Sequence, residues 1–304
     1  MNTLKPSFSV QVDVTNPGQF FACCGLLELA SRLWPGCEGW FDSQNPYFHV
    51  WSEDSSATLE RIIHFLSTCE ISGLTEEQRK EREALEAEKR RLKKEGYELP
   101  DAQEARRKML GEMAREGSLF IGTPFHLRLD WWQGKDEDPN TPKTWAGRQE
   151  LHKVARSAQD AISHIPDLCQ LFDYCCVLYL PQEYRKRKSD QSKSVEPFYF
   201  DARRFAHALD VGFSLDVQEF DTLAYPAVEL LCLIGLQRFR PAPPKMQWQF
   251  AYSVWFSPVS APIAAAIVSG AVPVYPVDRY CFSLVFRDDQ RRYKAFDFAT
   301  LLGG

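Results

Sequence analysis

The sequence lacks the short motifs that mark most catalytic and cofactor sites. It contains no GxGxxG, GxxxxGK(S/T), HExxH or GxSxG pattern, so nothing points to a dinucleotide, P-loop nucleotide, zinc-protease or serine-hydrolase site. CxxC spacing is also missing, and the six histidines are dispersed along the chain. We therefore expect no metal, no cofactor and no enzymatic activity.

Long apolar runs and a strong net charge are lacking as well. The longest apolar runs, 227–236 and 261–268, are too short to span a bilayer, and no stretch near the first residue resembles a secretory signal. We expect a cytoplasmic protein that does not enter a membrane. The formal net charge is −5 and the pI about 5.8, so any site for nucleic acid must be a local patch.

The nine cysteines do not suggest a disulfide framework. Their number is odd, and most of them lie inside apolar runs, as Cys23 and Cys24 do. We interpret them as small buried apolar side chains.

Hydrophobic periodicity is present throughout the first half of the chain. Residues 7–14 predict a strand and residues 20–34 a helix. Residues 39–51 predict two short aromatic strands, residues 57–69 a helix, and residues 118–132 a strand-like run. This β-α-β-β-α-β order predicts an α+β fold in which residues 1–132 form a ferredoxin-like (RRM-like) domain. Residues 74–117 interrupt it with a charged helical hairpin, because the run breaks at Gly96–Pro100. Its balanced charges favour a solvated face with i,i+4 ion pairs over a nucleic-acid arm.

The second half is less regular. Residues 133–194 read as a helix over 144–165 followed by a basic linker, and residues 195–304 as a second α+β domain. Its expected elements are a strand at 198–202, a helix at 225–237, a strand at 249–256, a helix at 261–269 and a terminal hairpin at 280–298.

Basic side chains mixed with aromatic and amide groups are the candidate binding features. The expected helix at 144–165 begins with a basic and aromatic cluster, Lys143, Trp145 and Arg148. We expect backbone N–H groups at this helix start to bind a phosphate while Trp145 stacks on a base. An equally weighted alternative makes Trp145 a core residue. Arg203 and Arg204 follow an aromatic strand. Residues 237–240 end an apolar helix, where an arginine can also be present because the helix dipole stabilises a positive charge at the C-terminus.

Two further groups complete the set. The run 185–188 is strongly basic and suits phosphate contact without sequence readout, and the amides at the turn before the first helix are expected to be exposed. The predicted nucleic-acid-binding residues are Asn16, Gln19, Lys143, Trp145, Arg148, Arg185, Lys186, Arg187, Lys188, Arg203, Arg204, Gln237, Arg238 and Arg240.

One histidine keeps a catalytic alternative open. His207 lies among Asp201, Arg203, Arg204 and Asp210, which is a suitable setting for a general acid or base in RNA cleavage. It has no paired catalytic partner in the sequence.

Four stretches together resemble one known family. They are TNPGQFFACCGLLELASRLWPG, LRLDWW with KTWAGRQ, FYFDARR with DVGFS, and YPAVELLCLIGLQRFRP. They are similar to the large-subunit-like protein of type I-U (also called I-G) CRISPR-Cas systems. The resemblance covers both ends and the centre of the chain but not the charged hairpin or the basic run.

The resemblance implies a non-catalytic subunit of a Cascade-type effector complex in antiviral defence. Such a complex contains other effector subunits and a guide RNA, binds target DNA, and passes the displaced strand to a separate helicase-nuclease. Alternatives are a guide-RNA-processing ribonuclease that uses His207, and a structural adaptor without direct nucleic-acid contact. The resemblance supplies no residue map, so the binding residues above are inferred from charge and placement alone.

Overall fold

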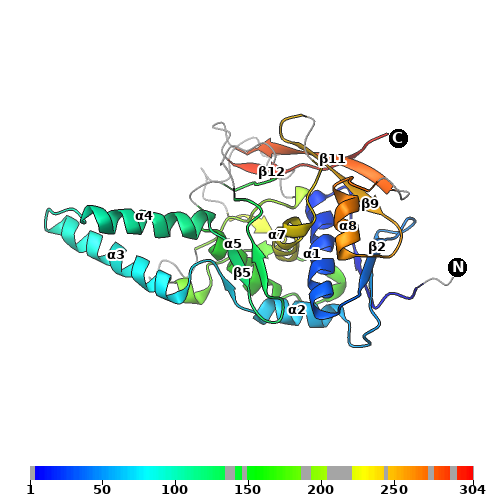
Figure 1. Ribbon diagram of the computed structural model, residues 1–304, viewed down its shortest axis with the longest axis horizontal. Helices are drawn as coiled ribbons and strands as arrows, with labels where there is room; N and C mark the ends of the chain where they lie inside the picture. The colour runs from blue at the N-terminus through cyan, green and yellow to red at the C-terminus, as the bar shows by residue number, and fades with distance from the viewer. Residues whose placement is uncertain are drawn as a thin grey trace.

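The fold is a mixed α+β arrangement of seven α-helices and several small antiparallel sheets (Figure 1). The computed structural model describes residues 4–133, 141–145, 149–185, 193–203, 221–242, 246–272, 277–287 and 293–303, and these statements concern them. The α-helices are α1 (Pro17–Leu33), α2 (Leu59–Thr68), α3 (Glu76–Lys94), α4 (Asp101–Glu116), α5 (Leu151–Ile162), α7 (Pro226–Arg238) and α8 (Ala261–Val268), with short 3₁₀ turns η1 (Leu168–Gln170) and η2 (Gln182–Tyr184).

Two four-stranded sheets and two smaller ones hold the strands. The first sheet has the order β1-β3-β2-β10, and in the second β11 pairs with β9 on one side and with β12 and β13 on the other. The bounds in these sheets are β1 (Phe8–Gln11), β2 (Glu38–Phe41), β3 (Tyr47–Trp51), β10 (Val259–Ser260), β9 (Gln249–Trp255), β11 (Val277–Phe286), β12 (Lys294–Phe296) and β13 (Thr300–Leu301). The smaller sheets are β4-β5-β6 (Ile71–Ser72, Leu119–Ile121, Leu127–Leu129) and β7-β8 (Cys176–Val177, Leu223–Ala224).

Helix α1 follows the first strand after the turn predicted from Asn-Pro-Gly. The Asn16 side chain accepts a hydrogen bond from the Gly18 N–H at 3.1 Å, and Pro17 occupies a first-turn position where no N–H is needed. Residues 17–30 are all buried, so the helix is enclosed on every side. An apolar helix without a polar face is typical of such a central position.

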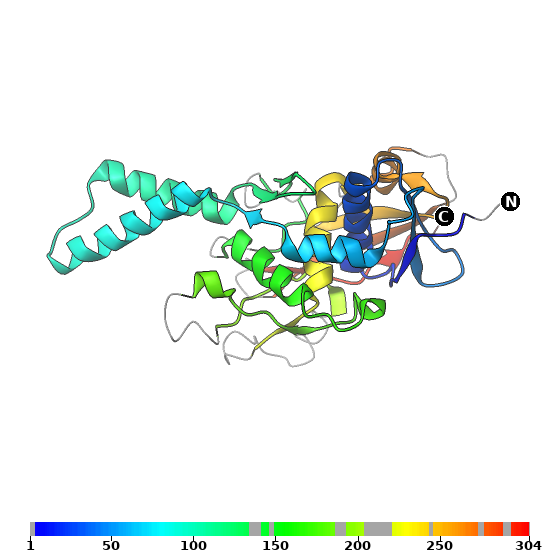
Figure 2. The same cartoon turned by 90° about the horizontal axis from the view of Figure 1, so that it is seen from below.

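Helices α1 and α7 pack directly against each other in the middle of the molecule (Figure 2). Two glycines make this contact possible. A Cβ atom on Gly25 would lie 2.1 Å from the Leu231 carbonyl oxygen, and one on Gly235 would lie 2.0 Å from the Phe21 carbonyl oxygen. The backbones therefore meet without any side chain between them.

The main hydrophobic core extends from the first strands to the last ones. The Phe20 ring stacks on Tyr252 with centroids 4.2 Å apart, and Phe41 packs edge-to-face on Trp255 at 4.9 Å. The Trp255 indole N–H donates to the Gly39 carbonyl oxygen at 2.7 Å. Residues of both predicted α+β domains thus share one core, while the predicted domain boundaries at 132 and 194 stay a prediction.

The charged segment forms the predicted pair of helices, α3 and α4, which project from one end of the body (Figures 1 and 2). Ion pairs join the two helices: Arg106 contacts both carboxylate oxygens of Glu81, and Arg107 reaches Glu86 at 2.6 Å. Lys89 pairs with Glu104 at 2.9 Å. The charges therefore mostly stabilise the hairpin across its seam, rather than only along one helix as predicted.

Three predicted elements are wrong in detail. Residues 118–132 form the hairpin β5-β6 rather than one strand, because the chain turns where Phe125 N–H donates to the Gly122 carbonyl at 2.9 Å. The helix expected from 144 begins only at Leu151, and the Thr144 carbonyl instead accepts a hydrogen bond from the Lys294 N–H. Residues 198–202 form no strand, because Tyr199 has a φ of 65°.

The cysteine prediction is right in part. Cys23, Cys24, Cys69 and Cys232 are buried free thiols, and so is Cys37 in its turn. Cys169 and Cys175 are exposed, contrary to expectation. Burial raises the pKa of Cys37 to about 12, which keeps that thiol protonated and unreactive near neutral pH.

Replacement of Gly25 by alanine should strongly destabilise the protein. The new Cβ atom would collide with backbone of α7, which cannot move aside alone, so we expect the free energy of unfolding to fall by about 3 kcal/mol. Urea denaturation followed by circular dichroism measures this change. The control is Gly111→Ala in α4, where the nearest atom to a Cβ is Arg115 Nη1 at 3.5 Å. That variant should be neutral or more stable by about 1 kcal/mol, and equal losses in both variants would contradict the packing interpretation.

Candidate functional site

The predicted binding residues at the start of α1 lie inside the protein. Asn16 is fully buried and Gln19 is 4% exposed, so the expectation that their amides are exposed is wrong. Asn16 Nδ2 donates to Asp201 Oδ1 at 2.9 Å, and its Oδ1 accepts from the Ala202 N–H at 3.2 Å. Gln19 Oε1 accepts from the Asp13 N–H at 2.8 Å. The Asn16 amide joins distant parts of the chain, whereas Gln19 bonds to a residue six positions before it.

A buried carboxylate completes this polar network. Glu229, on the first turn of α7, is 1% exposed, and its Oε1 accepts from the Phe200 N–H at 3.2 Å. The Asp201 N–H also lies within 3.4 Å of that oxygen. These bonds take the donors that a strand at 198–202 would need, which explains why no strand forms there.

Arg203 is held by the same network. Its Nη2 lies 2.9 Å from Asp201 Oδ2 and its Nη1 lies 2.6 Å from Asp173 Oδ1. The guanidinium also stacks over the Tyr225 ring at 3.8 Å. Although burial opposes the charge, these hydrogen bonds and carboxylates raise the pKa of Arg203, so its charge is already balanced within the protein.

The predicted residues at the end of α7 also make internal contacts. Gln237 Oε1 accepts from the Asp130 N–H at 2.9 Å, and Arg240 Nη1 donates to the Trp131 carbonyl at 3.1 Å. Arg238 pairs with Glu28, which is 1% exposed, and hydrogen bonding to that carboxylate raises the pKa of Arg238. These three side chains anchor α7 to its neighbours.

Lys143 and Trp145 lie before α5 rather than on it. Both are buried, and the Lys143 Nζ lies 5.7 Å from the centre of the Trp145 ring. Trp145 packs edge-to-face on Trp131 and Trp132, with centroids 5.6 Å and 5.7 Å away. The core alternative for Trp145 therefore describes its position, and no phosphate site at a helix start is formed here.

Several predicted residues cannot be placed. Arg148, Lys186, Arg187, Lys188, Arg204 and the alternative catalytic residue His207 lie outside the described residues. Arg185 is described, and its Nε donates to the Leu180 carbonyl oxygen at 2.6 Å.

A cleft of about 590 Å³ lies at the root of the hairpin. The first turns of α3, the start of α5, the turn η2 and Lys193 form its walls. Sequence reasoning did not find it, because its walls come from segments that are far apart in the chain. Its cationic side chains outnumber its carboxylates, six to four: Arg79, Lys80, Arg82, Arg90, Lys153 and Lys193 against Glu83, Glu86, Glu150 and Glu183.

Most of these carboxylates already have cationic partners. Glu150 pairs with Arg82 at 3.0 Å and with Lys153 at 3.0 Å. Glu86 and Glu183 pair with Arg107 and Arg156, which are not among the lining residues. The local charge of the cleft region is therefore more positive than its lining alone suggests.

Ionisation in the cleft follows from these contacts. Burial alone would raise the pKa of Glu150, but hydrogen bonds and charge from Arg82 and Lys153 outweigh it and lower the pKa to about 2. Burial lowers the pKa of His152, so that the ring is neutral at neutral pH. Arg79 Nε is buried and has no hydrogen-bond partner among the described residues.

The described residues on either side of the segment that contains the predicted basic run lie at this cleft. Tyr184 and Lys193 line the cleft, and the Leu180 N–H donates to the Lys193 carbonyl at 3.1 Å. The chain between them carries Arg185 and three further basic residues in sequence. Cations of α3 and α5 and Lys193, which are far apart in the chain, therefore lie together at the cleft.

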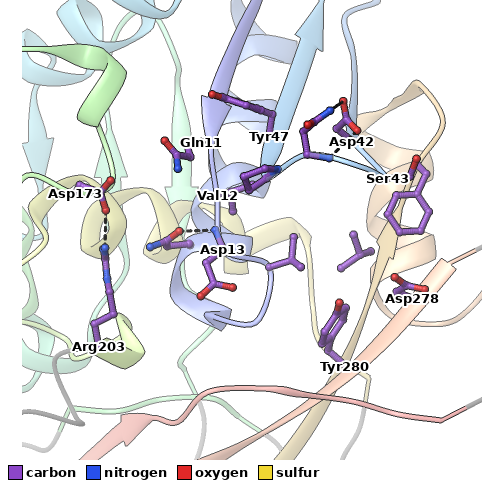
Figure 3. A pocket seen from close by; sticks show the side chains of 16 residues that line it. Gln11, Val12, Asp13, Asp42, Ser43, Tyr47, Asp173, Arg203, Asp278 and Tyr280 are labelled. Carbon is purple, nitrogen blue, oxygen red and sulfur yellow. Dashed lines mark hydrogen bonds and ion pairs between the residues drawn. The ribbon is translucent and has the colours of Figure 1, made fainter.

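Arg203 lines a different hollow, of about 410 Å³, between the end of β1 and the pair β9-β11 (Figure 3). Four aspartates line it against this one arginine. An anionic lining repels phosphate, so this hollow is a poor nucleic-acid site.

Three further observations bear on the function. No helix among the described residues is long and apolar enough to cross a membrane. Within the same residues no group of three or more His, Cys, Asp or Glu side chains could hold a metal ion. Comparisons with protein-family models, with curated proteins and with solved structures find no match. A function for this chain is therefore argued from its sequence and from the geometry and charge of the described residues.

Replacement of Asn16 by alanine should destabilise the fold rather than affect a binding surface. It removes the helix cap and leaves the Ala202 N–H buried without its acceptor, so we expect a loss of about 2–4 kcal/mol in the free energy of unfolding. Asn45→Ala in the exposed β2-β3 turn is the control and should change it by under about 1 kcal/mol. Unchanged stability combined with weaker oligonucleotide binding in Asn16→Ala would contradict the structural role.

Proposed function

We propose that this chain is a non-catalytic nucleic-acid-binding subunit of a CRISPR effector complex of type I-U/I-G. In that role it binds guide RNA, target DNA or both during antiviral defence. Its partners are the other effector subunits, and a separate helicase-nuclease acts on the captured target. The four family-like stretches of the sequence support this proposal.

The cleft at the hairpin root is the observation that carries the nucleic-acid part. Six cationic side chains line it, and three of its four carboxylates are engaged by arginine or lysine. Arg79 Nε adds a buried donor without an acceptor among the described residues, which a phosphate oxygen would satisfy. Lysine and arginine arranged in this way contact the phosphate backbone rather than base edges.

The arginines that the sequence predicted as binding residues are weaker candidates for phosphate contact than the cations of the cleft. Arg203 and Arg238 already pair with buried carboxylates, and Arg240 bonds to a backbone carbonyl. Moving any of them to a phosphate would leave a buried acceptor unpaired, which costs about 1–3 kcal/mol each. We therefore assign phosphate contact first to Arg79 and Lys193.

The ferredoxin-like, RRM-like unit at 1–132 is part of the same proposal. It is supported by the strand order β1-β3-β2, with α1 between β1 and β2 and with α2 after β3. Leu127–Leu129 pairs with β5 in a separate sheet, so the last strand of such a unit remains to be assigned. On the side of this sheet opposite the core, Trp40, Tyr47 and His49 lie close together, with ring centroids 5.3 and 6.3 Å apart.

A structural adaptor is the second candidate function. The projecting hairpin favours it, because Glu81, Glu86 and Glu104 neutralise its arginines and lysine across the seam. An arm of this kind suits docking to another subunit. The ribonuclease alternative depends on His207, and metal-free cleavage of a repeat RNA, lost in His207→Ala, tests it.

Removal of two charges from the cleft should weaken oligonucleotide binding. For the double variant Arg79→Gln with Lys193→Gln we expect a loss of about tenfold or more in affinity, and a decrease of about two in the slope of log K against log salt concentration. Fluorescence anisotropy with a labelled single strand, a duplex and a repeat RNA measures both. The matched control, Lys93→Gln with Lys94→Gln, removes the same charge at the hairpin tip. Equal effects in the two variants would refute a specific cleft.

Co-purification tests membership of the effector complex. Expressed with its neighbouring genes, the tagged chain should bring down other subunits and a guide RNA of defined length. Ultraviolet crosslinking within that complex should then join the RNA or target DNA to α3 or to the segment 184–193. A complex without a crosslink to this chain would favour the adaptor, and recovery of the chain alone would contradict both.

A further inference from the structure

The acidic hollow beside β1 is built from separate parts of the chain. Asp13 follows β1, Asp42 follows β2, Asp173 follows η1, and Asp278 lies on β11 (Figure 3). Among the described residues of its lining, Arg203 is the only cationic side chain. The volume of about 410 Å³ can hold a side chain from another molecule.

These four carboxylates are not equally available. Asp173 pairs with Arg203 at 2.6 Å, and Asp42 Oδ1 accepts from the backbone N–H groups of Gln44 and Asn45. The side chain of Asp278 makes no hydrogen bond or ion pair with any residue that the structure describes. Its charge is therefore uncompensated at the wall of the hollow.

A tyrosine hydroxyl points into the same space. Tyr280 is 8% exposed, and Figure 3 shows its hydroxyl directed into the hollow. That hydroxyl has no hydrogen-bond partner in the described part of the chain. The hydroxyl oxygen is not among the unpartnered side-chain atoms that are shielded from solvent, so it is open to a ligand that enters the hollow.

The tyrosine is held rigidly in this orientation. Its ring stacks on Tyr252 with centroids 5.7 Å apart and an interplanar angle of 16°. The Tyr252 hydroxyl in turn donates to the Val14 carbonyl oxygen at 2.6 Å, which joins β9 to the end of β1. Burial and the charges of Asp278 and Asp13 raise the pKa of Tyr280, so both carboxylates lie within electrostatic reach of the hydroxyl.

We propose that this hollow, the acidic pocket, receives an arginine or lysine side chain of a protein partner. Asp278 and Asp13 form ion pairs with the cationic group, and the Tyr280 hydroxyl accepts one of its N–H bonds. The apolar walls at Val12 and Phe256 cover the methylene stem, as long cationic side chains require. Tyr47, 41% exposed, lies at the pocket and offers its ring to the cation.

Charge complementarity selects this occupant. Phosphate is repelled by the aspartates, so nucleic acid does not fit, and the described residues contain no group that could hold a metal ion. A free polyamine shares the cationic chemistry, but only a group carried on a chain also gains from the exposed ring of Tyr47. The acidic pocket and the basic cleft are separate surfaces, and this proposal does not depend on nucleic-acid binding.

A peptide pair tests the proposal. The probes are acetyl-Gly-Gly-Arg-Gly-Gly-amide and the same peptide with citrulline, which keeps the shape but lacks the charge, titrated into the full chain and followed by NMR. The arginine peptide should bind at least about tenfold more tightly than the citrulline peptide. Equal binding of the two peptides would overturn the proposal.

Variants locate the binding. Asp278→Asn should weaken arginine-peptide binding about tenfold and Tyr280→Phe about threefold, whereas the control Asp54→Asn, which removes the same charge outside the pocket, should leave it unchanged. Asp278 is exposed and makes no side-chain bond that the fold needs, so its variant stays informative if Tyr280→Phe does not fold. Unchanged binding in Asp278→Asn would contradict the assignment.

Two further arms separate the alternatives. Spermidine that binds more tightly than the arginine peptide and is lost in Asp278→Asn would assign the pocket to free polyamines instead of a protein. Oligonucleotide binding in Asp278→Asn should equal that of the unaltered protein, because the basic cleft is intact. Failure of the peptide arm alone therefore rejects the acidic pocket, and failure of oligonucleotide binding alone rejects the proposed function.

Discussion

The close contact of α1 and α7 is the constraint on which the rest of the fold depends. Because glycines stand at both crossing points, the two backbones approach to a distance that no side chain would permit. The segment after Phe198 is packed in the same manner, since a Cβ on Gly18 would lie 2.3 Å from the Phe200 carbonyl oxygen. The starts of α1 and α7 and this segment are thereby brought together, and the polar network of Asn16, Asp201 and Glu229 can form only because of that packing.

The buried ion pairs in this part of the protein fix the orientation of the helices and segments more than they add to the free energy of unfolding. Glu28 is enclosed between Arg32 and Arg238, and Asp201 is enclosed beside Arg203. Removing a charge from water costs much of what the ion pair returns, so such pairs contribute little net stability but strongly favour one orientation of the elements they join. At the hairpin root, in contrast, six cationic side chains lie with four carboxylates among the described lining residues, so positive charge is in excess there.

The sequence was informative wherever local chemistry decides the outcome. The Asn-Pro-Gly turn, the apolar run after Tyr225-Pro226 and the break at Gly96 predicted the helices α1, α7, α3 and α4 within a few residues. It was uninformative where the partner is distant: Asn16 bonds to a residue 185 positions away, and an amide beside a turn normally faces solvent. Likewise, the strand expected at 198–202 is absent because Glu229 takes its N–H groups. Of the candidate site residues that the structure describes, none lines the cleft.

The hairpin also sets a length scale. With 19 residues, α3 extends about 28 Å from root to tip, which corresponds to about eight base-pair steps of a B-form duplex. The exposed Tyr97 at the tip and the basic cleft at the root are thus held at a fixed separation along the hairpin. A double helix lying along it would meet these points about three quarters of a turn apart, because one full turn takes about 10 to 10.5 steps.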